Sequence, residues 1–438
     1  MPRYSDNTVD IIGGGLAGCE AALYLSRHGI NVRLFEAKPK WFSPAHKSGG
    51  LAEIVCSNSL KSTSPTTAGG ALKNELNKLG STLLGIAEKC SVPAGSALAV
   101  DRDRFSGLVT DAVKSRGNIE IVEGVVERFD TSRLTLVCAG PVCHDGLAAY
   151  LAELTGERSL HFFDAAAPII TAECVDPEKS FFGARYGKGG DDYLNCPMNR
   201  EEYLAFYNAL ICAERAVDEV TGGDMTVFEG CMPVEVMAAR GVDALRYGPL
   251  RPVGFRDAGK PYAVLQLRRE NAEGSLYNLV GFQTNLKFGE QKRVFSLIPA
   301  LHDIEIIRYG VMHRNTFINA PTALNADLRL KKHDNIFIAG QLCGVEGYVE
   351  SMATGLMAAV NAERILCGKS TVVPPRETVI GALCNYIAAP NVDFQPMNAN
   401  FGILPSIDGV KKADRKKAYY DRSDAAVGEF VQSLAEHG

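Results

Sequence analysis

The chain has 438 residues, of which 46% are hydrophobic and 22% are charged, and its formal net charge is −5 at pH 7. This composition is that of an ordinary soluble globular protein. The length is long for one compact core, so we expect two domains or one domain with a large insertion. The net charge excludes a globally basic surface of the kind that attracts nucleic acid, although a local basic patch is compatible with it.

Cysteine usage and the first residues predict the compartment. The chain has twelve cysteines, and no two of them are spaced C-x-x-C. Scattered thiols in a long chain without a signal peptide are typical of reduced cytoplasmic proteins. No apolar run is long enough to span a bilayer, and the first predicted strand begins by residue 9, which leaves no room for a targeting peptide. We therefore expect a cytoplasmic protein that does not associate with membranes.

Residues 9–36 have the pattern of a strand, a glycine-rich turn, a helix and a second strand. Gly13, Gly15 and Gly18 form a G-x-G-x-x-G motif, and Glu36 ends the second strand 18 residues after Gly18. These glycines suit a tight turn, a close approach to a pyrophosphate and close helix packing, while the carboxylate suits a ribose hydroxyl. The alternative is a glycine-rich turn in an ordinary βαβ unit. The residues expected to hold the dinucleotide are Gly13, Gly14, Gly15, Leu16, Ala17, Gly18 and Glu36.

The pattern changes twice along the rest of the chain. An irregular segment, 37–71, is followed by helical periodicity and short strands, predicted at 72–90, 102–116, 120–126 and 134–140. From about 150 to 325, short strand-like runs alternate with helices, which indicates an inserted domain. An apolar strand at 335–341, a glycine-rich turn and a small-residue helix from about residue 352 then follow. This returning block is typical of FAD domains and favours FAD over NAD as the tightly bound cofactor.

The predicted fold is therefore α/β, a Rossmann-like FAD-binding domain with a large inserted α+β substrate domain. We expect the FAD-binding domain at 1–150 and 326–405, the inserted domain at 151–325, and a polar helical tail at 406–438. The tail has a basic run at 411–417, which is usually a solvated face, with RNA contact as the alternative.

Two cysteines stand in segments that suit chemistry. Cys56 follows His46 and Lys47 and precedes three small polar residues, and nearby cations would lower the pKa of its thiol. Cys231 lies between Gly230 and a Met-Pro pair, in a turn expected just before a helix. The alternative for both is a packed structural cysteine. A polar cluster at 308–316 could bind an anionic substrate or satisfy a buried turn, and no His, Cys or Asp cluster argues for a metal.

Ten strings of the sequence together resemble one known family, the folate- and FAD-dependent tRNA (uracil-5-)-methyltransferases of bacteria. They lie in order along nearly the whole chain, at 13–18, 53–62, 90–102, 163–168, 193–198, 228–233, 308–319, 339–341, 344–351 and 394–401. The departures from the family pattern are Cys19, in the first helical turn, and the loop 47–50.

The resemblance implies a two-step flavin reaction. NADPH or NADH reduces FAD, and a carbon from 5,10-methylenetetrahydrofolate is passed to C5 of the T-loop uridine at tRNA position 54 and becomes a methyl group. By resemblance, Cys231 attacks the uracil ring and Cys56 is a second functional cysteine near the flavin, although this division of labour stays open. Tyr348 is expected to stack on or near the isoalloxazine, beside Gly340, Gln341 and Gly347. Glu346 and Glu350 are candidates for the base that removes the C5 proton.

There are three alternatives to this function. The same chemistry could act on ribosomal RNA, because motifs around a flavin do not exclude it. A related wobble-uridine modification family is longer, and the Cys56 and Cys231 strings fit it poorly. A flavin-binding RNA assembly factor without turnover would need no reactive thiol. For RNA binding by an acidic protein, we expect Lys and Arg of the inserted domain and of 411–422 to gather on one face.

Overall fold

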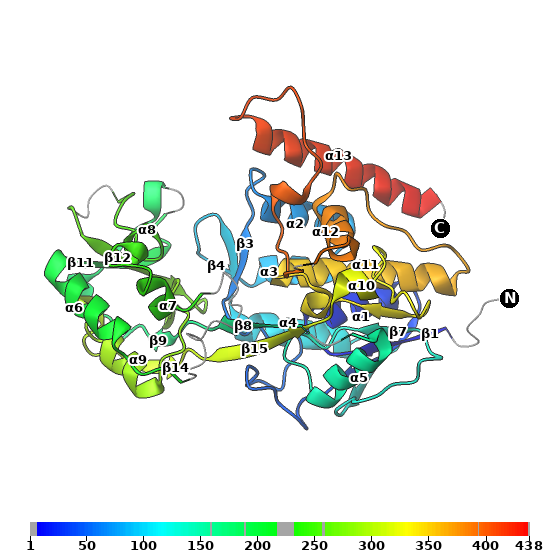
Figure 1. The fold of residues 1–438 in the computed structure, drawn as a ribbon, viewed down its shortest axis with the longest axis horizontal. Coiled ribbons are helices and arrows are strands. Elements are labelled where there is room, and N and C mark those ends of the chain that lie inside the picture. The colour runs from blue at the N-terminus through cyan, green and yellow to red at the C-terminus, as the bar shows by residue number, and fades with distance from the viewer. Residues whose placement is uncertain are drawn as a thin grey trace.

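The computed structural model describes residues 7–157, 160–187, 190–216, 232–255, 259–392 and 394–436. Figure 1 shows two parts of the molecule joined by a narrow two-stranded ribbon. We call the part at the right the first lobe and the part at the left the second lobe. The ribbon is an antiparallel pair, β8 (Leu160–Ala165) and β15 (Met312–Phe317), so the chain leaves and re-enters the first lobe along neighbouring strands. No helix in these described ranges is both long and apolar enough to cross a bilayer.

The first lobe is built on a parallel sheet of five strands in the order β16-β7-β1-β2-β6. Its strands are β1 (Thr8–Ile12), β2 (Asn31–Glu36), β6 (Ile119–Glu123), β7 (Thr135–Val137) and β16 (Ile336–Ile338). The central strands are apolar and buried, as expected where other elements cover both faces of a parallel sheet. Helices α1 (Leu16–Arg27) and α11 (Tyr348–Leu366) approach so closely that a Cβ on Gly355 would lie 2.3 Å from the Ala17 carbonyl oxygen.

A small antiparallel sheet and further helices complete the first lobe. The sheet has the order β3-β5-β4, with β3 (Ser59–Ser62), β4 (Ser91–Val92) and β5 (Ala97–Val100). The helices are α2 (Ala68–Lys78), α3 (Thr82–Lys89), α4 (Arg102–Lys114), α5 (Asp145–Thr155), α10 (Ala320–Ala323), α12 (Val379–Ala388) and α13 (Arg415–Glu436). The helical pattern predicted at 72–90 belongs to two helices, α2 and α3. Gly80, with φ +77°, follows the end of α2, and Ser81 caps α3 by accepting a hydrogen bond from Leu84 N.

The second lobe is built on an antiparallel sheet of six strands in the order β10-β11-β12-β13-β9-β14. The strands are β9 (Ile169–Thr171), β10 (Phe181–Phe182), β11 (Tyr193–Met198), β12 (Ala263–Arg269), β13 (Leu276–Leu279) and β14 (Ile306–Arg308), and the helices are α6 (Arg200–Ile211), α7 (Val234–Ala238), α8 (Ala244–Tyr247) and α9 (Phe288–Phe295). Leu265 and Leu267 of β12 point into a core shared with α6 and α9. Gln266 and Arg268 alternate with them and lie on the opposite, polar face. The predicted α/β class with a large inserted α+β part is confirmed.

The C-terminal helix is tied to the first lobe by a buried carboxylate. Glu75, on α2, accepts hydrogen bonds from the Val379 N–H (2.7 Å) and the Ile380 N–H (2.9 Å) at the start of α12. It also accepts one from the Ser423 hydroxyl of α13. One fully buried side chain therefore holds three helices together.

Folding stability is expected to fall as the pH rises from about 5 to 7, because burial raises the pKa of Glu75 to about 7. A carboxyl group that holds its proton more tightly in the folded chain favours folding in acid, and that advantage is lost as the pH approaches the folded pKa. At ~1.4 kcal/mol per pKa unit, the free energy of unfolding should fall by about 3 kcal/mol over this pH range. Urea unfolding at pH 5 and pH 7 measures it. Glu75→Gln should remove most of this pH dependence. If the variant keeps the full pH dependence, another titratable group causes it.

Candidate active site

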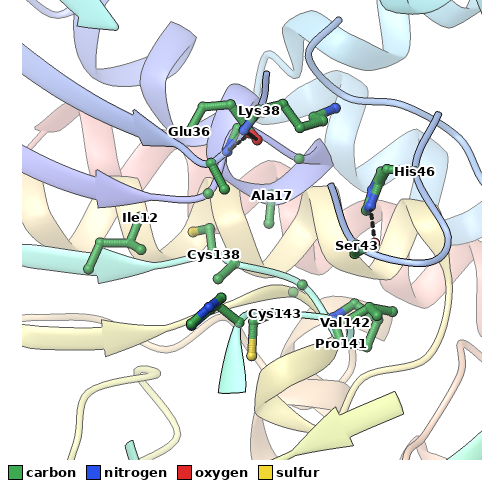
Figure 2. Close-up of a pocket in the computed structure, with 18 of the residues that line it drawn as sticks. Ile12, Ala17, Glu36, Lys38, Ser43, His46, Cys138, Pro141, Val142 and Cys143 are labelled. Atoms are coloured by element: carbon green, nitrogen blue, oxygen red, sulfur yellow. Dashed lines mark hydrogen bonds between the residues drawn. The ribbon is translucent and has the colours of Figure 1, made fainter. Parts of the chain in front are cut away.

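A long cavity runs along the carboxyl ends of the strands in the first lobe. Its volume is about 1140 Å³, including its open mouth. At one end it is lined by the turn after β1, residues 13–17, and at the other by Tyr348. Gly340 lines it next to the turn, since a Cβ on Gly340 would lie 3.3 Å from the Ala17 Cβ and 4.0 Å from the Ser351 Cβ. Figure 2 shows Glu36 and Lys38 on one side of this cavity and the segment 141–143 on the opposite side. Segments some 330 residues apart in the sequence thus line one cavity.

The glycine-rich turn forms one end of the cavity with its backbone. Gly13 has φ +103°, a left-handed conformation that favours glycine, and a Cβ on Gly18 would lie 1.9 Å from the Gly13 carbonyl oxygen. A Cβ on Gly15, by contrast, would meet no atom within 4 Å. Gly15 caps α1 without any side-chain hydrogen bond, so the first N–H groups of the helix are available to an anion at this end.

Glu36 ends β2 beside this turn, as the sequence predicts. Its carboxylate accepts hydrogen bonds from the Gly14 N–H and the Lys38 N–H, each at 2.9 Å. A carboxylate has about four acceptor sites, so these two bonds leave room for a hydroxyl donor. The side chain is buried at the cavity wall, where its position is fixed by the backbone on both sides.

The segment that follows β16 lines the cavity from beside Ala17 to Tyr348. The Gly340 N–H donates to Thr354 Oγ1 (2.9 Å), and Gln341 Nε2 donates to Glu346 (2.7 Å). Gly347, with φ +129°, caps α11 without a side-chain hydrogen bond, so α11 also begins with available N–H groups. The helix begins at Tyr348, four residues earlier than the sequence pattern predicts.

These features fit a flavin dinucleotide. One helix start, α1, offers N–H groups and an open approach over Gly15 to a pyrophosphate, and Glu36 stands where the ribose would follow. A second helix start, α11, faces the far end of the same cavity, where it would favour negative charge on a reduced ring system. A nicotinamide dinucleotide alone would not require this second end.

Cys56 lies directly beside the far end of the cavity. Its N–H donates to the Tyr348 hydroxyl (2.9 Å), and that hydroxyl in turn donates to Cys56 Sγ (3.3 Å). Cys56 Sγ donates to Asp164 Oδ2, which lies 3.6 Å away on β8. The three side chains form a chain of hydrogen bonds from the cavity wall to a buried carboxylate, which is a path along which a proton can move.

The predicted lowering of the Cys56 pKa is wrong. Burial, with the negative charge of Asp164, raises the pKa of this thiol to about 12. His46 bonds to the Ser43 hydroxyl (2.6 Å), and the Lys47 N–H donates to Glu53, so neither residue of the loop acts on the sulfur as expected. Cys56 therefore holds its proton at neutral pH in this structure, and it serves better as a proton donor or relay than as a thiolate.

Two further carboxylates lie at the start of α11. Burial and the charge of Asp164 raise the pKa of Glu346 to about 8. Glu350 accepts hydrogen bonds from Lys61 Nζ (2.7 Å) and the Ala399 N–H (2.9 Å) through one oxygen. Of the two candidate bases, Glu350 is committed to an ion pair, while Glu346 titrates close to neutral pH, which suits general base catalysis.

Three arginines hold the Cys56 loop in place. Arg102 donates to the carbonyl oxygens of residues 54–56 and pairs with Glu270 of the second lobe. Arg268 donates to Ser57 and Asn58, each at 2.8 Å, and Arg308 donates to the Val55 carbonyl oxygen (2.9 Å). Two of the three come from the second lobe, so that lobe positions a loop of the first. The sequence did not reveal this set, because an arginine in a strand carries no signal of a distant loop.

The structure locates only some of the remaining predicted site residues. Cys231 and its neighbours at 228–230 lie outside the described residues. The predicted polar cluster at 308–316 is divided, since Arg308 contacts the Cys56 loop while Arg314 lines a second cavity beside Trp41, His144 and His161. Within the described ranges, no group of three His, Cys, Asp or Glu side chains could hold a metal ion.

Comparison with known proteins gives one consistent result. A family model described as glucose inhibited division protein A matches residues 8–370. The methylenetetrahydrofolate–tRNA-(uracil-5-)-methyltransferase TrmFO of Acetivibrio thermocellus is 53% identical over 424 residues, which cover 96% of this chain and 97% of that one. The protein of the same name from Bacillus licheniformis is 50% identical over 436 residues, 98% of this chain and 100% of its own. Aquifex aeolicus GidA (form II crystal) shares the fold, with a TM-score of 0.71 at 15% identity over 98% of this chain and 73% of that one.

Proposed function

The chain belongs to the family of glucose inhibited division protein A and, within it, to the methylenetetrahydrofolate–tRNA-(uracil-5-)-methyltransferases, and we propose that it carries out their reaction on tRNA. The carbon donor is 5,10-methylenetetrahydrofolate, and the product is a 5-methyluridine at position 54 of the T-loop. The observation that carries the proposal is the cavity with a dinucleotide-binding turn at one end and Tyr348 at the other, where the Tyr348 hydroxyl is hydrogen-bonded to Cys56 and Cys56 to Asp164.

FAD is the resident cofactor in this proposal, and NADPH or NADH is its reductant. The residues that would hold it are Gly13, Gly14, Gly15, Leu16, Ala17, Gly18 and Glu36 of the first βαβ unit, and Gly340, Gln341, Gly347 and Tyr348 after β16. When bound, the flavin supplies the electrons that bring the transferred carbon to the methyl level. The start of α11 favours the negative charge that accompanies this role.

The side chains divide the proton and carbon chemistry. Uracil C5 becomes nucleophilic once a group adds to C6, and we assign that addition to Cys231. Cys56 holds a proton between the Tyr348 hydroxyl and Asp164, and it relays protons at the far end of the cavity. Glu346, with a pKa near 8, is the favoured acceptor of the C5 proton, because Glu350 is paired with Lys61.

The domain division and location complete the proposal. Residues 1–150 and 326–405 form the FAD-binding domain, 151–325 form the substrate domain, and 406–438 form a helical tail. The two larger hydrophobic cores among the described residues support this division, since the buried residues of the second of them run from Ile170 to Ile304. We propose a cytoplasmic protein that binds the T-arm of tRNA and works without a membrane.

Methylation of an unmodified tRNA transcript tests the function. The purified flavoprotein, given NADPH and 5,10-methylenetetrahydrofolate, should convert one uridine to 5-methyluridine. A U54C transcript should give no product, and product formed on ribosomal RNA but not on tRNA would instead support the ribosomal alternative. No methylated RNA of either kind, with the flavin intact, would contradict catalysis and favour an assembly factor.

Cys231→Ala should abolish this product while FAD stays bound. The expected loss follows from the need for a nucleophile at C6 before C5 can react. Cys212→Ser, at an exposed cysteine, is the matched control and should leave turnover unchanged. Loss of FAD together with activity would mean that Cys231 has a structural role.

A further inference from the structure

One edge of the second lobe carries exposed aromatic rings among arginines. Phe182 is 49% exposed on the edge strand β10, and Tyr186 is 54% exposed in the turn that follows. Arg185 lies over the Phe255 ring (4.9 Å), and Arg251 lies 6.0 Å from the centre of the Tyr186 ring. We call these residues, Phe182, Arg185, Tyr186 and Arg251, the edge patch.

The Tyr186 ring is held outward by a strained backbone. Its φ of +59° and ψ of 21° are left-handed, a conformation that costs a residue with a side chain about 1–2 kcal/mol. The Tyr186 N–H donates to the Gly254 carbonyl oxygen (2.7 Å), and a Cβ on Gly254 would come within 3.2 Å of the ring. The loop thus presents an aromatic ring to solvent, and strain of this kind is concentrated at functional sites.

The two arginines of the edge patch have no ion-pair partner among the residues that the structure describes. In the described part of the chain, no carboxylate lies within ion-pair distance of Arg185 or Arg251. Arg185 is held by neutral acceptors, Gln266 Oε1 (2.8 Å) and the Arg251 and Val253 carbonyl oxygens. Burial and the nearby charge of Arg251 lower the pKa of Arg185 to about 10. Two guanidinium groups in this arrangement are complementary to an anion.

The edge patch is joined to the Cys56 loop by one strand. Gln266, which holds Arg185, lies two residues before Arg268 on β12, so both point to the polar face of the sheet, about 7 Å apart along the strand. Arg268 contacts Ser57 and Asn58, immediately after Cys56. The edge patch therefore adjoins the sheet face that contacts the Cys56 loop through the buried Arg268.

We propose that the edge patch is a nucleotide-binding site, at which an unstacked base of the substrate RNA stacks on Tyr186 and its phosphate binds Arg251 and Arg185. This inference rests on the proposed function and deepens it, because it names where the RNA is held outside the catalytic cavity. Exposed aromatic faces beside arginines are how proteins bind single-stranded segments of RNA, and loops of tRNA offer such bases.

Tyr186→Gly is the decisive variant, because it removes the ring and relieves the left-handed strain together. We expect tRNA binding to weaken roughly 10-fold, which is within the range of one base–aromatic stacking contact. The KM for tRNA should rise while kcat and the KM for methylenetetrahydrofolate stay unchanged, and the melting temperature should not fall. Tyr186→Phe keeps the ring and should bind tRNA like the parent.

Arg251→Gln tests the phosphate contact separately. The slope of log Kd for tRNA against log salt should decrease by about 1, since one fewer counter-ion is released. Arg200→Gln is the matched control, because Arg200 begins α6 on the opposite face of the sheet. Unchanged tRNA binding in both Tyr186→Gly and Arg251→Gln, with a parent that methylates tRNA, would overturn this proposal alone. A rise only in the KM for methylenetetrahydrofolate would mean that the edge patch binds the folate, and it would also overturn this proposal. A parent protein that methylates no RNA would instead refute the proposed function itself.

Discussion

Cys56→Ala is expected to lower the rate of 5-methyluridine formation by about two to four orders of magnitude, the contribution of a positioned proton-transfer group. The substitution removes the sulfur that joins the Tyr348 hydroxyl to Asp164. FAD should stay bound, because Cys56 lies beside the cavity and its side chain does not form the dinucleotide-binding end. Single-turnover methylation of a tRNA transcript measures the rate, and flavin absorbance measures the cofactor.

The charge of Asp164 can be tested independently of turnover. Burial and Asp164 together raise the pKa of Cys56, so Asp164→Asn should lower that pKa and increase the thiolate fraction at pH 8. The alkylation of Cys56 by iodoacetamide can be measured by mass spectrometry at a series of pH values. The pH at which the alkylation rate rises should then be lower in the variant. Asp303→Asn, at an exposed carboxylate of the second lobe, is the control. An alkylation profile that does not move would contradict the role given to Asp164.

What the sequence predicted well is local. The turn at residues 13–18 and the acid at Glu36 follow one another within a single βαβ unit, and their spacing alone determines that they meet. The block at 340–348 could be placed for the same reason, because it follows a strand of the same parallel sheet. In each case the spacing of residues within a short segment determines which of them meet. The order of strands in the sheet then places the two segments beside each other.

What the sequence did not predict is the environment of Cys56. Neighbours along the chain, His46 and Lys47, suggested a lowered pKa, yet the residue that acts on the sulfur is Asp164, 108 positions away. Asp164 lies on β8, in the ribbon between the lobes, where no periodicity marks it as functional. The electrostatics of a buried thiol are decided by long-range contacts and by burial, and neither is written in local spacing.

Two glycines of the dinucleotide-binding turn should respond to alanine in opposite ways. A Cβ on Gly18 would lie 1.9 Å from the Gly13 carbonyl oxygen, so Gly18→Ala has to push α1 away from β1. Overpacking of this kind costs about 1–3 kcal/mol or more, and the variant should unfold at lower temperature with or without cofactor. A Cβ on Gly15 would meet no protein atom within 4 Å, so Gly15→Ala should fold normally.

Gly15→Ala should nevertheless purify without flavin, because the open space over Gly15 is where we expect the pyrophosphate to approach the backbone. The ratio of flavin to protein absorbance and the melting temperature of the apoprotein separate the two effects. Gly85→Ala, in α3 and also free of close neighbours, is the matched control and should keep its flavin. A Gly15→Ala protein with its full flavin content would show that the dinucleotide does not approach there, since no contact within the protein explains why this position is glycine.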